Sequence, residues 1–356
     1  MKLFSPDIFS VSNISYRNVS IENRILVERV VHQNYALLDL VVDVRQLSAM
    51  EINSNNFMVQ TRAGSRFLLK RIAVNTALDA LESQYQSSEI LRRAGVPMPE
   101  VLANDEGMLV TLNDRQERWT LTKFVEGEYY SGGEEALIKI GIGLGKIIEV
   151  FKNQDSKQLP VNSAVGSADE FECSFSRLMS SKQEWGGHFS EPNLTLLLEQ
   201  ESSLVGTGKL ILEGLSKLHT LPVAALHTDL HPHNVLVNDD GVAAFVDVDS
   251  LQLNIRAISI AFAVYKLVRQ HAVKVGYTSS DATHIRRVAR AFLSSISGVV
   301  EISDAEVEYL RFAASFEIYR RILIISNLNI IHGNSVWNKV LPMHFTALHE
   351  IPYIFD

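Results

Sequence analysis

The chain has 356 residues, 46% of them hydrophobic and 21% charged, so it is neither largely disordered nor collagen-like. Its formal net charge of −8 argues against a protein that binds a nucleic-acid backbone, because such binding requires a basic face. Its single cysteine, Cys173, excludes an intrachain disulfide framework and is expected to be a small buried hydrophobe. No apolar run approaches the roughly 18 residues of a membrane span. We therefore expect a cytoplasmic protein of about two domains that acts without nucleic acid or membrane, as a monomer or homodimer.

The first 45 residues are expected to form a partly helical extension. Ser20 can cap a helix with one apolar face. That face would consist of Ile25, Leu26, Val30 and Val31. The stretch 36–47 is apolar but ambiguous between helix and strand. The sequence leaves open whether this extension packs on the lobe that follows, takes part in dimerisation or stays partly mobile.

Residues 46–127 have the signals of a small β-rich lobe with one helix. The helix is expected at 77–94 and ends at Gly95, because the prolines that follow favour an extended chain. The residues at 62–65 are typical of a hairpin turn between two strands. The expected strands are 57–61, 67–74, 107–112 and 118–125.

From residue 128 to 356 the pattern becomes mainly helical. Ser303 and Glu306 have the spacing of a capping box at the start of one long helix. Two short strands, 235–237 and 243–248, are separated by a tight turn. The expected helices are 134–152, 192–218, 256–272, 281–296 and 304–328. The fold class is therefore α+β, with a β-rich lobe, a short connector and a larger α-helical lobe.

The most informative stretch is HTDLHPHN at 227–234, which is followed by the two short strands and by Asp247. Phosphoryl transfer requires a carboxylate that orients the attacking hydroxyl and accepts its proton, and Asp229 can supply it. It also requires oxygen ligands that hold Mg²⁺ on the phosphates. Because a hairpin folds back on itself, Asn234 at its entrance and Asp247 at its exit can converge on one ion. Asp249 can bind a second ion or hold the loop by accepting backbone hydrogen bonds.

The pattern H-x-D-x-x-x-x-N, followed by the Asp247 segment, resembles the aminoglycoside phosphotransferase and choline kinase group, which has the protein-kinase-like two-lobe fold. Phe67–Lys70 resembles the strand whose lysine holds the α/β-phosphates of the nucleotide, which implies that role for Lys70. The segment LTKFVEG at 121–127 resembles the hinge, whose backbone at Lys123 and Val125 would contact adenine.

The resemblance covers about residues 49–255. It implies an ATP-dependent (or GTP-dependent) kinase that uses Mg²⁺ and transfers the γ-phosphate to a hydroxyl of a small molecule. Aminoglycosides, choline-like amines, homoserine and sugars all fit as acceptors, and the acidic balance of the chain is a hint towards a cation.

Three features of the sequence keep alternatives open. Residues 53–56 contain no glycine where protein kinases have a glycine-rich phosphate loop. The position of the glutamate that would pair with Lys70 holds Gln84, so the candidates for that partner are Glu82, Gln84 and Glu89. These two departures favour a catalytically silent nucleotide-binding or regulatory protein on the same scaffold. The histidines at 227, 231 and 233 also permit a metal-dependent hydrolase.

Overall fold

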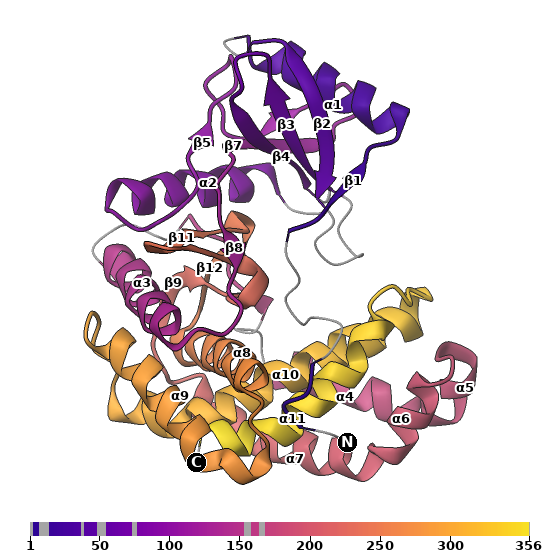
Figure 1. Ribbon diagram of the computed structural model, residues 1–356. Coiled ribbons are helices and arrows are strands. Elements are labelled where there is room, and N and C mark those ends of the chain that lie inside the picture. Colours follow the sequence, from indigo (N-terminus) through magenta and orange to yellow (C-terminus); the bar gives the residue numbers. More distant parts are fainter. Residues whose placement is uncertain are drawn as a thin grey trace.

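The computed structural model describes residues 3–6, 14–36, 39–47, 55–72, 77–152, 158–163 and 168–355. Figure 1 shows two lobes stacked one on the other, a β-sheet lobe at the top and a larger helical lobe below. This arrangement has the predicted α+β class. No helix within the described residues is both long and apolar enough to cross a lipid bilayer.

The upper lobe is built on a seven-stranded antiparallel sheet with the order β1-β2-β3-β4-β7-β5, in which β6 also pairs with β7. The strands are β1 (Tyr16–Asn18), β2 (Val41–Leu47), β3 (Asn56–Thr61), β4 (Arg66–Ile72), β5 (Val101–Leu102), β6 (Thr111–Leu112) and β7 (Arg118–Lys123). The ambiguous stretch 36–47 thus contains a strand. Of the strand expected at 67–74, the part up to Ile72 is confirmed as β4. Residues 73–76 lie outside the described residues.

The strand expected at 107–112 is only two residues long, and a side chain explains why. The side-chain oxygen of Asn104 accepts hydrogen bonds from the backbone N–H groups of Glu106 and Met108, and Gly107 has a φ of +81°. These bonds close a tight turn, because an asparagine side chain can replace the backbone partner of a turn. Pairing with β7 therefore begins only at Thr111.

Helix α1 (Ile21–Asn34) covers one face of this sheet. The Ser20 hydroxyl accepts a hydrogen bond from the Asn23 N–H at 3.2 Å, as expected of an N-cap. Val30 and Val31 of the predicted apolar face are buried in a cluster with Phe57 and other sheet residues, whereas Ile25 is 51% exposed. The described residues 14–36 therefore pack on the β lobe, one of the three possibilities that the sequence left open.

Helix α2 (Leu78–Arg93) lies between the sheet and the lower lobe and matches the predicted helix to within a residue at each end. Its buried side chains include Leu81, Tyr85 and Leu91. The Gln84 amide donates hydrogen bonds to the backbone oxygens of Asp249 and Leu251 at 2.6 and 3.0 Å. Gln84 thereby ties the helix of the upper lobe to the lower lobe.

The lower lobe packs helices around a few short strands. Its helices are α3 (Glu134–Lys152), α4 (Ala168–Ser180), α5 (Trp185–His188), α6 (Asn193–Glu199), α7 (Glu201–Leu218), α8 (Arg256–Val275), α9 (Ala282–Ser297), α10 (Asp304–His332) and α11 (Leu341–Phe355). Its strands are β8 (Glu128–Tyr129), β9 (Val223–His227), β10 (Val235–Asn238), β11 (Gly241–Phe245) and β12 (Leu251–Ile255). The helix expected at 192–218 is two helices that meet at Gln200, and α4 and α11 were not predicted.

Cys173 is exposed, contrary to the expectation of a buried hydrophobe. It lies on α4, whose buried side chains are Phe171 and Leu178. Because a helix turns about 100° per residue, a position two residues after Phe171 points to the opposite side of the helix, which here is solvent.

The predicted capping box at the start of α10 is confirmed, and it also supports a buried ion pair. The Ser303 hydroxyl accepts from the Glu306 N–H, and the Glu306 carboxylate accepts from the Ser303 N–H at 3.0 Å. The same carboxylate accepts from Nε of Arg256 at the start of α8, at 2.7 Å. The side chains of Arg256 and Glu306 are 14% and 0% exposed. Glu306 therefore joins two long helices of the lower lobe.

We expect Glu306→Ala to lower the free energy of unfolding by about 3–5 kcal/mol, the usual cost of leaving one charge of a buried pair without its partner. Burial raises the pKa of Glu306, but Arg256 and Ser303 outweigh it and hold this pKa below its ordinary value. The stabilisation is thus fully present above the unfolded pKa of about 4.3 and is lost as the pH falls through the lower folded pKa.

Urea unfolding at neutral pH, and in a series of buffers from about pH 4 down to about pH 2, would measure both effects. Glu308→Ala is the matched control, because Glu308 lies in the same part of α10 with a side chain that is 73% exposed. A control as destabilised as Glu306→Ala would contradict the role given to the buried pair.

Candidate active site

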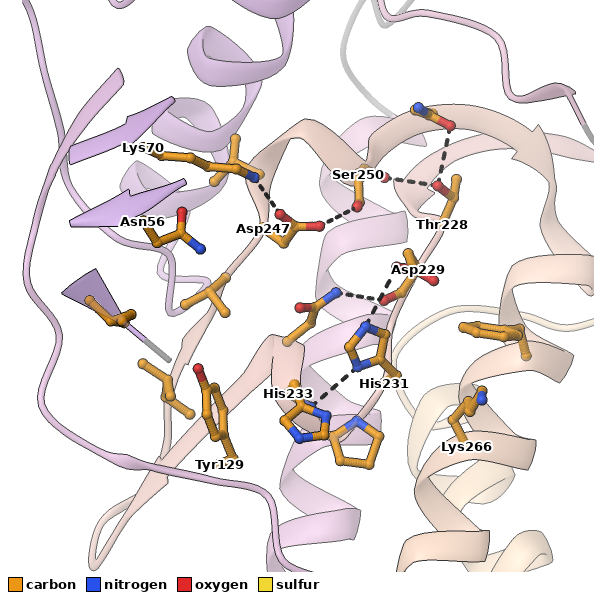
Figure 2. Close-up of a pocket in the computed structure, with 18 of the residues that line it drawn as sticks. Asn56, Lys70, Tyr129, Thr228, Asp229, His231, His233, Asp247, Ser250 and Lys266 are labelled. Atoms are coloured by element: carbon orange, nitrogen blue, oxygen red, sulfur yellow. Dashed lines mark hydrogen bonds and ion pairs between the residues drawn. The ribbon is translucent and has the colours of Figure 1, made fainter. Parts of the chain in front are cut away.

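A cavity of about 600 Å³ opens between the two lobes and is lined by residues of both. Figure 2 shows Lys70 and Asn56 on the β-sheet side, with Asp229, His231 and Asp247 facing them from the lower lobe. The six residues to which the sequence analysis gave a role in catalysis, in binding the first Mg²⁺ or in binding the nucleotide all line this cavity, whereas Asp249 does not. The six are Lys70, Lys123, Val125, Asp229, Asn234 and Asp247.

The loop that follows β9 holds Asp229 in place by hydrogen bonds within the loop and to the neighbouring strand. Nε2 of the buried His227 lies 2.9 Å from the Val246 carbonyl oxygen. The Asn234 side-chain amide donates to the Asp229 carbonyl oxygen at 2.9 Å, and the Asn234 carbonyl oxygen accepts from the Val246 N–H at 2.9 Å. Because the side-chain nitrogen of Asn234 binds the Asp229 backbone, the side-chain oxygen of Asn234 points away from that backbone. His227 is thus a structural brace.

Asp247 follows the β10–β11 hairpin in a left-handed backbone conformation, with φ of 66° and ψ of 55°. Aspartate tolerates this region better than most residues, but it still costs free energy that the surrounding structure must supply. Here the Ser250 hydroxyl donates to the Asp247 carboxylate at 2.9 Å, and the Ser250 N–H donates to the Asp247 carbonyl oxygen. The result is a carboxylate aimed into the cavity, toward Lys70 (Figure 2).

Lys70 on β4 contacts two aspartates of the lower lobe. Its ammonium lies 2.5 Å from the Asp247 carboxylate and also contacts Asp249. None of the three candidate partners on α2 is bonded to it. Gln84 binds the 249–251 backbone, Glu82 accepts from the backbone N–H groups of Leu109 and Val110, and Glu89 binds Arg92 and the Val101 N–H. The expectation of a partner on α2 is therefore wrong for this conformation.

These short contacts shift the pKa values of all three charged groups. Burial raises the pKa of Asp247, but Lys70 outweighs it and brings this pKa to about 2. Burial and the neighbouring Asp247 raise the pKa of Asp249. Burial lowers the pKa of Lys70, yet the two aspartates hold it well above its ordinary value. Lys70 and Asp247 are therefore both charged at neutral pH.

Arg321 on α10 is a site residue that the sequence did not reveal. Its guanidinium donates to the Asp229 carboxylate at 2.8 Å and to Glu317 at 2.7 Å, and it lies 4.1 Å from the centre of the Phe262 ring. Burial raises the pKa of Asp229, but Arg321 and His231 outweigh it and hold this pKa well below its ordinary value. Asp229 is consequently an ionised carboxylate at neutral pH.

The connector between the lobes, residues 122–127, lines the cavity with Thr122, Lys123 and Val125 among others. Its Lys123 N–H donates to the Glu100 carbonyl oxygen at 2.8 Å, and its ammonium pairs with the Glu100 carboxylate at 2.6 Å. Because the backbone N–H of Lys123 is already bonded to Glu100, a ligand that approaches the backbone of Lys123 can bind only its carbonyl oxygen. The apolar side chains that line the cavity here are Leu47, Leu68, Leu236 and Val246. They can enclose a flat apolar ring system.

The structure bears on two points that the sequence left open, the glycine-free loop and the metal-dependent hydrolase. Of the glycine-free loop 53–56, only Asn55 and Asn56 are among the described residues, and Asn56 lines the cavity. Across the described ranges, no group of three or more histidine, cysteine, aspartate or glutamate side chains is placed to hold a metal ion. The metal-dependent hydrolase therefore has no histidine-based ligand set in this part of the chain.

A family model described as the phosphotransferase enzyme family matches residues 43–288. The chain belongs to this family. The matched segment contains the whole β10–β11 hairpin, the loop that carries Asp229 and the strand that carries Lys70. The predicted resemblance is thereby confirmed, and the chain is a phosphotransferase. By sequence, no curated protein matches it.

Solved structures resemble this family member over nearly its whole length. An amicoumacin kinase in complex with AMP-PNP and Ca²⁺ has a TM-score of 0.64 at 14% identity, with 93% of each chain covered. A spectinomycin phosphotransferase in complex with ADP and spectinomycin has a TM-score of 0.64 at 12% identity, with 94% of this chain and 95% of that chain covered. A choline kinase from Streptococcus pneumoniae has a TM-score of 0.58 at 14% identity, with 94% and 99% covered. At these identities the likeness shows the fold, which is the predicted protein-kinase-like one.

Proposed function

We propose that this phosphotransferase moves the γ-phosphate of ATP, or of GTP, to a hydroxyl group of a small molecule. The observation that supports it most is the meeting of Asp229, Asn234 and Asp247 with Lys70 around one cavity, although the chain separates them widely. Phosphoryl transfer depends mainly on positioning and on neutralising charge, and these four residues carry the groups for both tasks.

Asp229 would accept a hydrogen bond from the acceptor hydroxyl and fix its oxygen in line with the γ-phosphorus. The new bond forms between this oxygen and phosphorus, and the bond from phosphorus to the β–γ bridging oxygen breaks, which releases ADP. The hydroxyl proton passes to Asp229. Because the pKa of Asp229 is held well below its ordinary value, this carboxylate is a weak base, so orientation is its main contribution.

Asn234 and Asp247 would hold Mg²⁺, whose chemistry is to neutralise the charge of the phosphate oxygens. Their oxygens are the hard ligands that this ion prefers. Lys70 would neutralise the α- and β-phosphates, and its contacts with Asp247 and Asp249 keep its ammonium beside the proposed metal ligands. The similar structures of an amicoumacin kinase and a spectinomycin phosphotransferase contain AMP-PNP with Ca²⁺ and ADP, which supports nucleotide binding here.

The connector would bind the purine. The Lys123 carbonyl can accept a hydrogen bond and the Val125 N–H can donate one, a pair of groups that suits the edge of adenine. The apolar side chains around them would stack on the ring faces.

A catalytically silent nucleotide-binding protein is the second candidate, and the pairing of Lys70 with two aspartates favours it. In that pairing the lysine blocks the groups that would hold the metal. Incubation of the protein with ATP and a panel of hydroxylated compounds, with ADP release as the readout, would separate the two. An active kinase also shows slow Mg²⁺-dependent ATP hydrolysis that Asp229→Asn removes. Nucleotide binding without any Mg²⁺-dependent turnover would instead support the silent protein.

A further inference from the structure

The cavity continues past Asp229, away from the proposed phosphates, into a region walled by α8, α10 and the 337–344 segment. In Figure 2, Lys266 of α8 lies on the far side of Asp229 and His231 from Lys70. An acceptor whose hydroxyl meets Asp229, while the phosphates lie on the Lys70 side, extends into this region. The walls of the region therefore select the body of the acceptor.

The wall that α10 contributes changes from charged to apolar along the helix. Arg321 binds Asp229, and the residues three, four and seven positions after it also line the cavity: Ile324, Ile325 and Leu328. These spacings place the four side chains on one face of a helix. At 1.5 Å per residue, Leu328 lies about 10 Å along the helix axis from Arg321. The apolar face thus begins beside the proposed catalytic carboxylate and runs away from it for about two turns.

The other walls continue this apolar surface. They contribute Phe262 of α8, Trp337 and Val340 of the segment before α11, and Met343 of α11. Two large apolar side chains of the region remain well exposed, Ile324 at 42% and Trp337 at 37%. Exposed apolar surface inside a cavity is typical of a ligand site, because a ligand that covers it removes this surface from water.

The arginines of the lower lobe that line the cavity are tied to buried carboxylates of the protein. Arg320 and Arg321 both bind Glu317, at 2.8 and 2.7 Å. Arg269 of α8 binds Glu350 at 2.7 Å. Each of these arginines therefore has its counter-ion within the protein.

Lys266 and His344 also line the region without requiring a charged acceptor. The Lys266 ammonium has partners of its own in the protein, among them the Met343 sulfur at 3.6 Å. The pKa of His344 is held well below its ordinary value by burial first and then by Lys266 and Arg321, so its imidazole is neutral at neutral pH. Apolar contact is thus the interaction that the region chiefly offers an acceptor.

We propose that the acceptor is an alcohol with an apolar body, whose hydroxyl meets Asp229 while its hydrocarbon part lies along Ile324, Leu328 and Trp337. This inference rests on the proposed phosphotransfer. An apolar body gains binding free energy from every CH₂ group that it removes from water. A polyhydroxylated body would instead lose hydrogen bonds with water that these walls replace only in small part.

Three uncharged compounds that carry a hydroxymethyl group on a six-membered ring test the inference: cyclohexylmethanol, tetrahydropyran-2-methanol and 1,5-anhydroglucitol. Their rings increase in polarity in that order. We expect kcat/KM, from ADP release, to fall in the same order and to be about tenfold or more higher for the first compound than for the last. Equal values for the three, or a preference for 1,5-anhydroglucitol, would overturn the inference.

A substitution in the apolar face locates the preference. Ile324→Gln places an amide in that face and should lower the ratio of kcat/KM between cyclohexylmethanol and 1,5-anhydroglucitol by about threefold or more. Ile331→Gln is the matched control, because Ile331 is a similarly exposed isoleucine of α10, at 49%, that does not line the cavity. The control should keep the wild-type ratio. An unchanged ratio in Ile324→Gln, or an equal loss in both variants, would contradict the position given to the apolar body.

Tryptophan fluorescence in the presence of AMP-PNP and Mg²⁺ measures acceptor binding without turnover. Of the three tryptophans, all within the described residues, Trp119 and Trp185 are fully buried and only Trp337 lines the cavity. Cyclohexylmethanol should shift the emission to shorter wavelength, and Trp337→Phe should remove this shift. The shift without ADP release from any compound would support the apolar site and overturn the proposed phosphotransfer. Neither a shift nor turnover with cyclohexylmethanol would overturn the inference itself.

Discussion

Asp229→Asn is expected to lower kcat by a factor of about 10²–10⁴, because the variant loses both the orientation of the attacking hydroxyl and the group that accepts its proton. The substitution keeps the size of the side chain and its contact with Arg321 but removes the charge that orients the hydroxyl. The affinity for ATP should stay near that of the wild type, because Asp229 faces the acceptor side of the cavity and not the proposed phosphate side. Steady-state ADP release and calorimetric titration with AMP-PNP measure these two quantities on the same preparation.

Asp239→Asn is the matched control for this substitution. Asp239 lies in the exposed turn of the β10–β11 hairpin and does not line the cavity. Its substitution therefore changes the same residue type in the same part of the chain. A wild-type kcat in Asp229→Asn would remove this carboxylate from its proposed role. Equal losses in both variants would indicate damage to the fold.

Asp247→Ala is expected to weaken binding of ATP in the presence of Mg²⁺ by at least about 10–100-fold, since loss of even an outer-shell partner of a metal costs that much. Asp247 also holds the Lys70 ammonium at 2.5 Å, so its removal frees Lys70 to bind phosphate. In EDTA the affinities of the variant and the wild type should therefore differ little, or the variant should bind more tightly.

Calorimetric titration of both proteins with and without EDTA gives the comparison. The decisive quantity is the difference that Mg²⁺ makes to the affinity. If Mg²⁺ strengthens binding equally in Asp247→Ala and in the wild type, the metal is held elsewhere.

The parts of the site that are contiguous in the chain could be predicted from the sequence. Asp229 and Asn234 lie in one short loop, and a hairpin with a recognisable turn returns the chain to Asp247, so local pattern was enough to bring the three together. Lys70 and the connector were found through their order along a known family pattern. The capping box at Ser303 was likewise a local signal, which the structure confirms.

Contacts between distant segments were beyond the sequence. Arg321 is 92 residues from Asp229 in the chain. In the sequence, the adjacent Arg320 and Arg321 look like ordinary solvent-exposed residues of a helix. The contacts of Lys70 with Asp247 and Asp249 depend on the relative position of the two lobes, which the spacing of residues along the chain does not reveal. The cationic side chains of the lower lobe that line the cavity are likewise brought together only by the tertiary fold, because Lys266 belongs to α8 whereas Arg320 and Arg321 belong to α10.

The most direct measurement is the location of a manganese ion, used in place of magnesium, by anomalous scattering from crystals grown with AMP-PNP. The account predicts a peak in the cavity between the lobes at a coordination distance of about 2.1 Å from oxygens of both Asn234 and Asp247. It also predicts that the γ-phosphate lies between this ion and Asp229. A nucleotide bound in the cavity with its metal away from these two side chains would contradict the account.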